Sequence, residues 1–463
     1  MSYEGLSPEL AGEVLTVALK RGGELAELYV EERSSLSLRL EDGRVEQAVT
    51  GVDRGASLRV VRGVTTVFGY VDAVNEADLL GLATELGGSA AGQREAIVVV
   101  REAEASGKRR PPEPERRSAH TGARLLHLVD ESARAVSREV CQVVASYGES
   151  RQRVWIAGSY GALAVDDRYR VIVSVTVTAQ RDGLLQTAQD SLAYVGASSS
   201  PGEDAVRGLA EDVAKRAVTL LDSRPAPAGR MPVVLANGFG GVLFHEACGH
   251  GLEADHVLKQ SSVWAGMVGQ RVAGEHVFAY DDGSLPGIWG SCSCDDEGVT
   301  CGRTVLIEAG VLTGYLTDRL RARRLDLGLT GNGRRQDYRH LPYPRMTNTF
   351  IGAGKHKAAE LIGDTPYGLY ARSFSGGQVN PATGEFVFGV SEAYLIEKGR
   401  LTAPVRGATL IGSGPQILLA IDAIADDLEI KAGMCGKEGQ SVPVGTGQPT
   451  LRIREMTVGG TAA

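Results

Sequence analysis

The hexapeptide His245-Glu246-Ala247-Cys248-Gly249-His250 follows an apolar, glycine-rich run over residues 233–244. It brings two imidazoles and one carboxylate into a single short stretch. A divalent metal ion that activates water needs neutral nitrogen ligands and a nearby carboxylate base that does not itself bind the ion. This stretch can supply both, so we interpret the rest of the chain as its scaffold, its substrate surface and the source of a third ligand.

The two histidines are separated by five positions, whereas the familiar zinc-protease helix separates them by four. On an ideal helix a spacing of four places two side chains roughly 40° apart, and a spacing of five places them roughly 140° apart. We therefore expect a π-bulge or a helix end between the histidines, with His250 at or beyond a distorted last turn. The competing interpretation is a plain helix end that carries two solvated histidines and a surface glutamate.

A catalytic zinc site usually has three protein ligands and one open position, so two histidines leave one ligand missing. Cys435, in the glycine-flanked segment 433–437, is one candidate. A thiolate there would lower the charge of the site and increase the need for Glu246 as a base. Cys248 is the other candidate, since it lies roughly 60° from His245 on a helix, although a small buried thiol explains it equally well. Spacing alone does not decide between the two cysteines.

Length and composition limit the class of protein. A chain of 463 residues exceeds one hydrophobic core, so we expect two domains, with three as the alternative. The net charge of -8 disfavours a nucleic-acid partner. No apolar run is long enough to predict a membrane span, and the polar, acidic N-terminus carries no signal sequence, which favours a cytoplasmic protein. Six cysteines are too few for a disulfide framework and are expected to be thiols.

The first half of the chain alternates helical and strand patterns. Helices are predicted over residues 7–22, 75–88, 122–145 and 203–221, with antiparallel strands over 25–70 and again over 154–157, 163–165, 170–179 and after the turn at 181–183. This order suggests a duplicated unit. The predicted fold is α+β, with a helix-plus-antiparallel-sheet domain over 1–224 and a β-rich catalytic domain over 230–463. The catalytic domain carries the helix that contains His245 and His250, called the histidine helix below, and a C-terminal loop that contains Cys435.

The second half contains two segments of similar sequence, since residues 306–313 and 395–402 both predict a hairpin with an X-Gly turn. This similarity indicates either an internally pseudo-symmetric sheet or two unrelated hairpins of a common kind. A last helix is predicted over 415–428. The charged, proline-rich segment 104–118 predicts an exposed loop or linker.

Several other side chains have weaker signals. Cys292, Cys294 and Cys301 lack a fourth ligand at a diagnostic spacing and are expected to be loop or core thiols. Asp255 and His256 follow the hexapeptide closely and could orient a ligand ring or be solvated.

Residues 245–253, His-Glu-Ala-Cys-Gly-His-Gly-Leu-Glu, resemble the HExxxH segment of the TldD branch of the TldD/PmbA (TldE) zinc metallopeptidases. The resemblance is dense from about residue 232 onward and loose before it. Further matching segments are 330–335, 344–349, 376–385, 407–412 and 434–444. The resemblance to this family implies that His245, His250 and Cys435 bind Zn²⁺ and that Glu246 is the general base. It therefore favours Cys435 over Cys248 as the third ligand.

The resemblance also implies a cytoplasmic peptidase of unfolded or leader peptides. Its partner would be a TldE-like homologous subunit or a second copy of the chain, with the active site enclosed in the dimer and an extended peptide held by strand addition. The family-like motifs contain five candidate donors to the oxyanion, which are Arg334, Arg335, Tyr338, Arg345 and Asn348. The alternative function is a metal-stabilised peptide-binding or regulatory subunit without catalysis, against which the presence of Glu246 argues.

Overall fold

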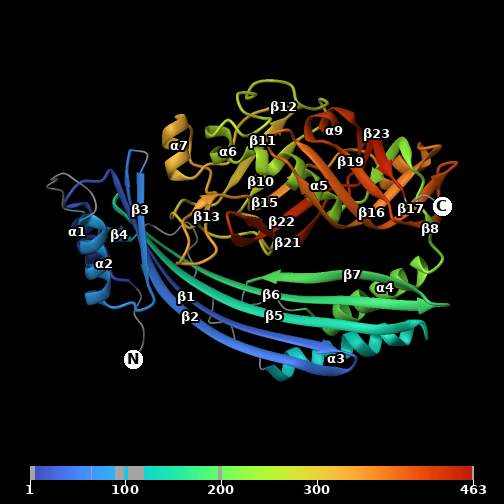
Figure 1. The fold of residues 1–463 in the computed structure, drawn as a ribbon, viewed down its shortest axis with the longest axis horizontal. Coiled ribbons are helices and arrows are strands. Elements are labelled where there is room, and N and C mark those ends of the chain that lie inside the picture. The colour runs from blue at the N-terminus through green and yellow to red at the C-terminus, as the bar shows by residue number, and fades with distance from the viewer. Residues whose placement is uncertain (1–5, 64, 89–97, 103–118, 197–200, 461–463) are drawn as a thin grey trace.

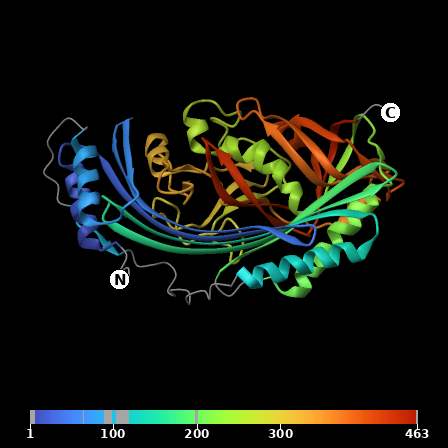
Figure 2. The same ribbon diagram turned by 60° about the horizontal axis from the view of Figure 1, so that its bottom comes forward.

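The computed structural model describes residues 6–63, 65–88, 98–102, 119–196 and 201–460. The N-terminal half forms a long, curved, mainly antiparallel sheet, and the β-rich C-terminal half lies on the concave side of that sheet (Figures 1 and 2). The predicted α+β class is confirmed. Within the described ranges, no helix is both long and apolar enough to cross a membrane. The predicted loop at 104–118 lies outside the described residues.

The N-terminal half repeats the order helix, three antiparallel strands, helix. The first unit is α1 (Pro8–Leu19), β1 (Leu25–Glu41), β2 (Arg44–Arg62), β3 (Thr65–Val71) and α2 (Glu76–Gly88). After β4 (Arg101–Glu102), the second unit is α3 (Ala119–Val136), β5 (Val140–Gly158), β6 (Ala162–Arg181), β7 (Leu184–Val195) and α4 (Glu203–Leu220). Pairing of β1 with β5 joins both units into one sheet, and this order agrees with the predicted duplication.

The predicted helix over 122–145 is wrong at its C-terminal end, where residues 140–145 begin β5. The register of β5 against β6 shifts between Val140 and Gln142. Because of this irregularity the buried residues Val140 and Val143 are three positions apart, which imitates helical spacing. Pairing along almost all of β6 then keeps the segment extended.

Alternation along β1 decides what each face of the sheet touches. Leu28 and Val30 pack in one cluster with α1 and α2, and Leu38 and Leu40 pack in another with α3 and α4. Figure 2 shows these helices on the side of the sheet away from the C-terminal half. Tyr29, on the opposite face, packs against the C-terminal half. The sheet therefore forms a layer with α1, α2, α3 and α4 packed on one face and the C-terminal half packed on the other.

The C-terminal half is built mainly of strands. Its elements are β8 (Arg224–Pro225), β9 (Gly229–Leu235), η1 (Gly238–Gly240), α5 (Gly241–Phe244), η2 (His245–Gly249), η3 (His250–Leu252), α6 (Ala254–Leu258), β10 (Ala279–Asp282), β11 (Arg303–Glu308), β12 (Val311–Leu312), α7 (Arg319–Leu325), β13 (Gly333–Arg334), β14 (Tyr343–Pro344), β15 (Asn348–Ile351), α8 (Ala358–Gly363), β16 (Tyr367–Val379), β17 (Glu385–Glu397), β18 (Arg400–Arg406), β19 (Thr409–Ser413), α9 (Gly414–Ala420), β20 (Ile421–Ile424), β21 (Glu429–Lys437), β22 (Gln440–Gln448) and β23 (Leu451–Gly459). One sheet has the order β12-β11-β10-β15-β22-β21, and a larger one has the order β16-β9-β23-β19-β17-β18-β8. The histidine helix packs between these sheets and belongs to their shared hydrophobic core.

The two similar segments, 306–313 and 395–402, form the predicted hairpins β11–β12 and β17–β18. They lie in different sheets, so the idea of one pseudo-symmetric sheet is wrong. The predicted last helix over 415–428 is also too long. It ends at Ala420 because Ile421 to Ile424 pair with β23, and tertiary pairing there overrides the apolar pattern. The domain division between residues 224 and 230 stays a prediction.

Candidate metal centre

The segment that carries the two histidines is a distorted helix, as predicted. One turn of π-helix over His245–Gly249 follows α5, and a 3-10 turn over His250–Leu252 ends the segment. The backbone N–H of His250 donates to the carbonyl of His245, which is the i→i+5 bond of a π turn. This geometry turns both imidazoles to the same side, with ring centroids 5.1 Å apart and ring planes at 86°.

Glycines allow this segment to lie directly against its neighbours. A Cβ at Gly241 would lie 2.6 Å from the Cα of Gly447 in β22, closer than real side chains approach backbone. A Cβ at Gly249 would collide with the sulfur of Met346. The glycine-rich sequence before and within the hexapeptide therefore sets how deeply the two histidines are buried.

The structure brings Cys435, on β21, to the two histidines. Its Sγ lies 3.4 Å from His250 Nε2, and one potential ligand atom from each of the three residues lies within 4.8 Å of the others. Burial alone would raise the pKa of Cys435, but His245 and His250 hold it well below its ordinary value. The thiolate, which is the form that binds metals, is thus favoured. Cys248 instead packs in the hydrophobic core, where burial raises its pKa.

Glu246 is the most accessible group of the cluster. Its Oε2 lies 3.8 Å from His250 Nε2, and its side chain is 30% exposed to solvent. A carboxylate in this position can reach a water molecule at the histidines while remaining open to the solvent side, where a substrate would arrive.

A second layer of charged groups fixes His250 and β21. Glu253, which is fully buried, has Oε2 3.0 Å from His250 Nδ1 and 2.9 Å from Lys437 Nζ. Lys437 also donates to Asp255 Oδ1 at 2.6 Å, and it follows Cys435 by two positions on β21. Burial alone would lower the pKa of His250, but Glu253 and Cys435 raise it well above its ordinary value. Lys437 therefore ties the cysteine strand to the end of the histidine helix.

Glu253 and Lys437 were not predicted from the sequence. Asp255 and His256 were the predicted candidates for partners of a ligand ring, but Asp255 contacts Lys437, and the ring of His256 lies 3.4 Å from Ser261 Oγ. The spacing of Glu253, three positions after His250, was the available signal, because such residues are neighbours on a helix surface. Nothing in the local sequence pointed to Lys437, since its contact with Glu253 crosses 184 positions of the chain.

The candidate oxyanion donors are all buried and hydrogen-bonded to protein groups. Arg334 donates to the carbonyls of Met346 and Pro443, and Arg345 donates to the carbonyl of Cys435. The remaining contacts are those of Arg335 to Glu27 and Ser57, of Tyr338 to Asp53 and Asp72, and of Asn348 to Asp282 and Ser291. Arg335 and Tyr338 thus hold the C-terminal half on the N-terminal sheet. Arg345 supports the strand that carries Cys435.

The donor set fits a zinc ion. Tetrahedral zinc with its usual bond lengths to nitrogen and sulfur separates the two ligand atoms by about 3.5 Å, close to the 3.4 Å between His250 Nε2 and Cys435 Sγ. In the part of the chain that the structure describes, the buried Nδ1 of His245 has no hydrogen-bond partner, which is a polar atom that a bound ion could satisfy. Two imidazoles and one thiolate are also ligands that zinc accepts.

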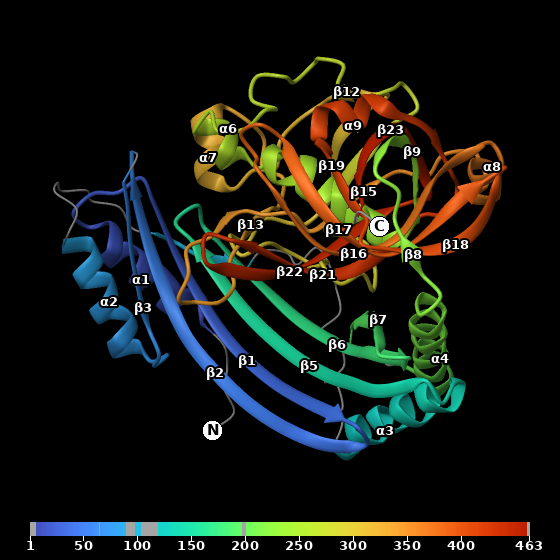
Figure 3. The ribbon, with the colours of Figure 1, turned by 45° about the vertical axis from the view of Figure 1, so that its right-hand side comes forward.

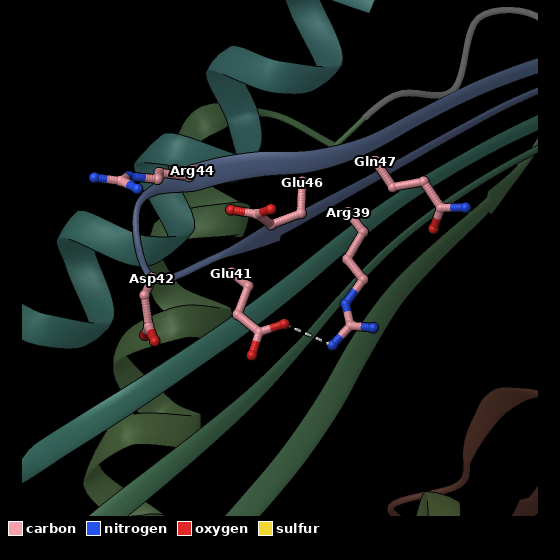
Figure 4. A pocket seen from close by; sticks show the side chains of 6 residues that line it. All are labelled: Arg39, Glu41, Asp42, Arg44, Glu46 and Gln47. Carbon is pink, nitrogen blue, oxygen red and sulfur yellow. Dashed lines mark hydrogen bonds and ion pairs between the residues drawn. The ribbon is translucent and has the colours of Figure 1, made fainter.

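A separate hollow lies at the tip of the β1–β2 hairpin. It is open and polar, and Figure 4 shows the side chains that line it, Arg39, Glu41, Asp42, Arg44, Glu46 and Gln47. All six come from β1, β2 and the turn between them. This hollow offers no histidine or thiol, so it is not a candidate for the chemistry of the hexapeptide.

A histidine pair on a π turn, with a glutamate between the histidines and a distant thiolate facing them, offers the groups that a metallopeptidase needs. Comparison with known proteins agrees. The model of PmbA/TldA metallopeptidase domain 1 matches residues 26–86, that of the central domain matches 112–221, and that of the C-terminal domain matches 228–460. The chain therefore belongs to the TldD/PmbA family of metallopeptidases, as its sequence motifs predicted.

Similar proteins match all or part of the chain. The metalloprotease TldD homolog of Haemophilus influenzae is 40% identical over 479 residues, which cover 100% of this chain and 98% of the relative. A zinc metalloprotease TldD homolog of Saccharolobus solfataricus is 34% identical over 250 residues, 53% of this chain and 55% of the relative. The crystal structure of TldE from Thermococcus kodakarensis has the same fold, with a TM-score of 0.79 and 18% identity over 95% of this chain and 97% of that one.

Proposed function

We propose that this chain is a zinc-dependent peptidase that cleaves unfolded or leader peptides. His245, His250 and Cys435 bind the ion, and Glu246 is the general base. The observation that carries the proposal is the convergence of these four side chains. The potential ligand atoms of the two histidines and the cysteine lie within 4.8 Å of one another, and Glu246 Oε2 lies 3.8 Å from His250 Nε2. The name of the zinc metalloprotease from Saccharolobus solfataricus supports the choice of metal.

The protein groups then have distinct tasks. His245, His250 and Cys435 would hold a zinc ion, which would supply Lewis acidity for the scissile carbonyl and for a water molecule. Glu246 accepts a proton from the attacking water on a carboxylate oxygen and donates it to the leaving amine. Glu253 accepts a hydrogen bond from His250 Nδ1, which leaves Nε2 as the nitrogen that faces Cys435. Lys437 holds Glu253 in that position.

An extended peptide can add to the edge of β21. This strand carries Cys435 and, among the described residues, pairs only with β22. Beside it, a pocket of about 90 Å³ lies between the N-terminal sheet and β21–β22, and Met434, Ser441 and Pro443 form part of its wall. Figures 1 and 3 show β21 above the concave side of that sheet. Backbone pairing there would bind peptides with little dependence on their side chains, which suits unfolded substrates.

We further propose that the working assembly is a dimer, formed with a TldE-like homologous subunit or with a second copy of the chain, and that it acts in the cytoplasm without binding nucleic acid. Glu246 stays partly exposed in the single chain, so a second subunit could enclose the site. Copurification of a tagged chain from its own cells would reveal the partner. Recovery of a monomer alone, at concentrations where the protein is active, would contradict a dimer.

The deciding experiment replaces Glu246 with Gln. We expect the Glu246→Gln protein to bind about one zinc per chain and to lose peptidase activity toward an unfolded peptide mixture, because the amide cannot accept the proton. Wild-type protein treated with a chelator should lose activity and regain it with zinc. If wild-type protein with bound zinc cuts none of the peptides but still binds them, the alternative function as a peptide-binding subunit is correct. Cleavage by Glu246→Gln at the wild-type rate would exclude Glu246 as the base.

A further inference from the structure

Two cysteines outside the metal centre touch each other. Cys292 and Cys301 lie in the segment between β10 and β11, and their Sγ atoms are 2.7 Å apart. Cys292 is half-buried and Cys301 is buried. The backbone holds them in place, because the N–H of Cys301 donates to the carbonyl of Ser293 and the N–H of Cys292 to the carbonyl of Gly283. Contact between the two sulfurs therefore follows from the path of the chain.

The surroundings of this pair favour reactivity. Hydrogen bonding from Cys301 lowers the pKa of Cys292, and the guanidinium groups of Arg168 and Arg334 lower it further against the effect of burial. A partly exposed thiolate next to a second thiol is the arrangement of a redox-sensitive cysteine pair. Cys294, between the two in sequence, differs from them. It is buried against the N-terminal sheet, and burial raises its pKa well above the ordinary value.

We propose that Cys292 and Cys301 form a reversible disulfide when the protein meets hydrogen peroxide. The Cys292 thiolate attacks one peroxide oxygen, the O–O bond breaks, and the other oxygen leaves as hydroxide, so that Cys292 becomes a sulfenic acid. This hydroxide takes up the proton that Cys292 released when it ionised. The sulfur of Cys301 then attacks Cys292, the S–O bond breaks, and the departing hydroxide takes the proton of Cys301. Two thiols and one peroxide thus give one disulfide and two waters, and a dithiol reductant reverses the change.

The disulfide would close the segment that docks the C-terminal half on the sheet. Between the two cysteines, Asp296 accepts a hydrogen bond of 2.7 Å from Arg168 of β6, and Glu297 pairs with Arg59 of β2. Arg168 also donates to the carbonyl of Cys294 at 2.8 Å. Closing this loop reduces its freedom in the unfolded chain, so oxidation should raise the stability of the folded protein. This inference does not depend on the proposed peptidase activity.

Differential alkylation of the full chain tests the proposal. Reduced, zinc-loaded protein is treated with hydrogen peroxide and unfolded in one alkylating reagent, and is then reduced and labelled with a second, isotopically distinct reagent. We expect the second label on Cys292 and Cys301, and the first label on Cys294, which serves as an internal control on the same peptide. Peroxide-treated protein in which Cys292 and Cys301 carry the first label would overturn the proposal, as would the second label on Cys294.

Variants separate the two steps. In Cys301→Ser, Cys292 should stop at the sulfenic acid and react with a sulfenate-specific probe, because the second thiol is missing. Cys141→Ser removes an exposed thiol of β5 and should oxidise like the wild type. Thermal unfolding should shift upward on oxidation in the wild type and in Cys141→Ser, and should not shift in Cys292→Ser. An equal upward shift in Cys292→Ser would contradict the assignment of the disulfide.

Discussion

Replacing Glu253 with Gln tests how the protein prepares His250 for a metal. The substitution keeps the volume of a fully buried side chain and removes its charge. In the wild type, Glu253 Oε2 serves both His250 Nδ1, at 3.0 Å, and Lys437 Nζ, at 2.9 Å. A glutamine has only one acceptor oxygen. If this oxygen faces His250, the amide N–H groups face the ammonium group of Lys437 and cannot accept its hydrogen bond. Lys437 keeps Asp255 as a partner, at 2.6 Å, so the fold should survive.

The expected loss can be estimated from this geometry. The variant exchanges a charge-assisted hydrogen bond on the ligand ring for a neutral one, and groups that orient a ligand ring usually contribute about 10- to 100-fold to metal affinity. This range corresponds to about 1.4–2.7 kcal/mol at 25 °C. We therefore expect the zinc dissociation constant of Glu253→Gln to rise by about 10- to 100-fold. At saturating zinc, peptidase activity should recover in large part, because Glu246 is unchanged.

Competition with a chromophoric chelator measures the zinc dissociation constant directly. Glu392→Gln is the matched control, since Glu392 of β17 is also a buried glutamate, and it pairs with Arg216 of α4 at 2.6 Å. Its zinc affinity should equal that of the wild type. An unchanged zinc affinity in Glu253→Gln, or the same loss in Glu392→Gln, would refute a specific role of Glu253 in orienting His250.

Three further predictions concern the ligand, the packing and the pH dependence. Cys435→Ala should lose bound zinc, as measured by metal analysis, whereas Cys248→Ala should keep it, and the opposite result would exchange the roles of the two thiols. Gly241→Ala should push the histidine helix off the backbone of Gly447 and lower the free energy of unfolding by about 1–3 kcal/mol in chemical denaturation, and an unchanged value would contradict close packing there. Burial raises the pKa of Glu31 from 4.5 to about 7, so this group destabilises the fold as pH rises through that interval, by up to about 3 kcal/mol. The melting temperature should therefore fall less between pH 4.5 and pH 7 for Glu31→Gln than for the wild type. An equal fall in both proteins would contradict the raised pKa.

Part of the fold could be predicted because the signals were local. The Asp42-Gly43 turn joins β1 to β2 with positive φ at both residues, as an Asp-Gly pair between alternating apolar runs predicts. The five-residue spacing of His245 and His250 required a distorted turn, and the π turn supplies it. Where local pattern and long-range pairing conflicted, as at residues 140–145 and 421–424, the prediction was wrong, because pairing with β6 and β23 decides the backbone there.

Residue types and their order along the chain specify which reactive groups are available: two imidazoles, a carboxylate between them and a small number of thiols. Only the tertiary structure brought Cys435 rather than Cys248 to those imidazoles, across 185 positions of the chain, and placed Glu253 and Lys437 behind His250. The physical reason is that residue type and spacing fix local backbone geometry, whereas ligand distances depend on how β21 and the histidine helix pack in one core. That packing is a property of the whole C-terminal half.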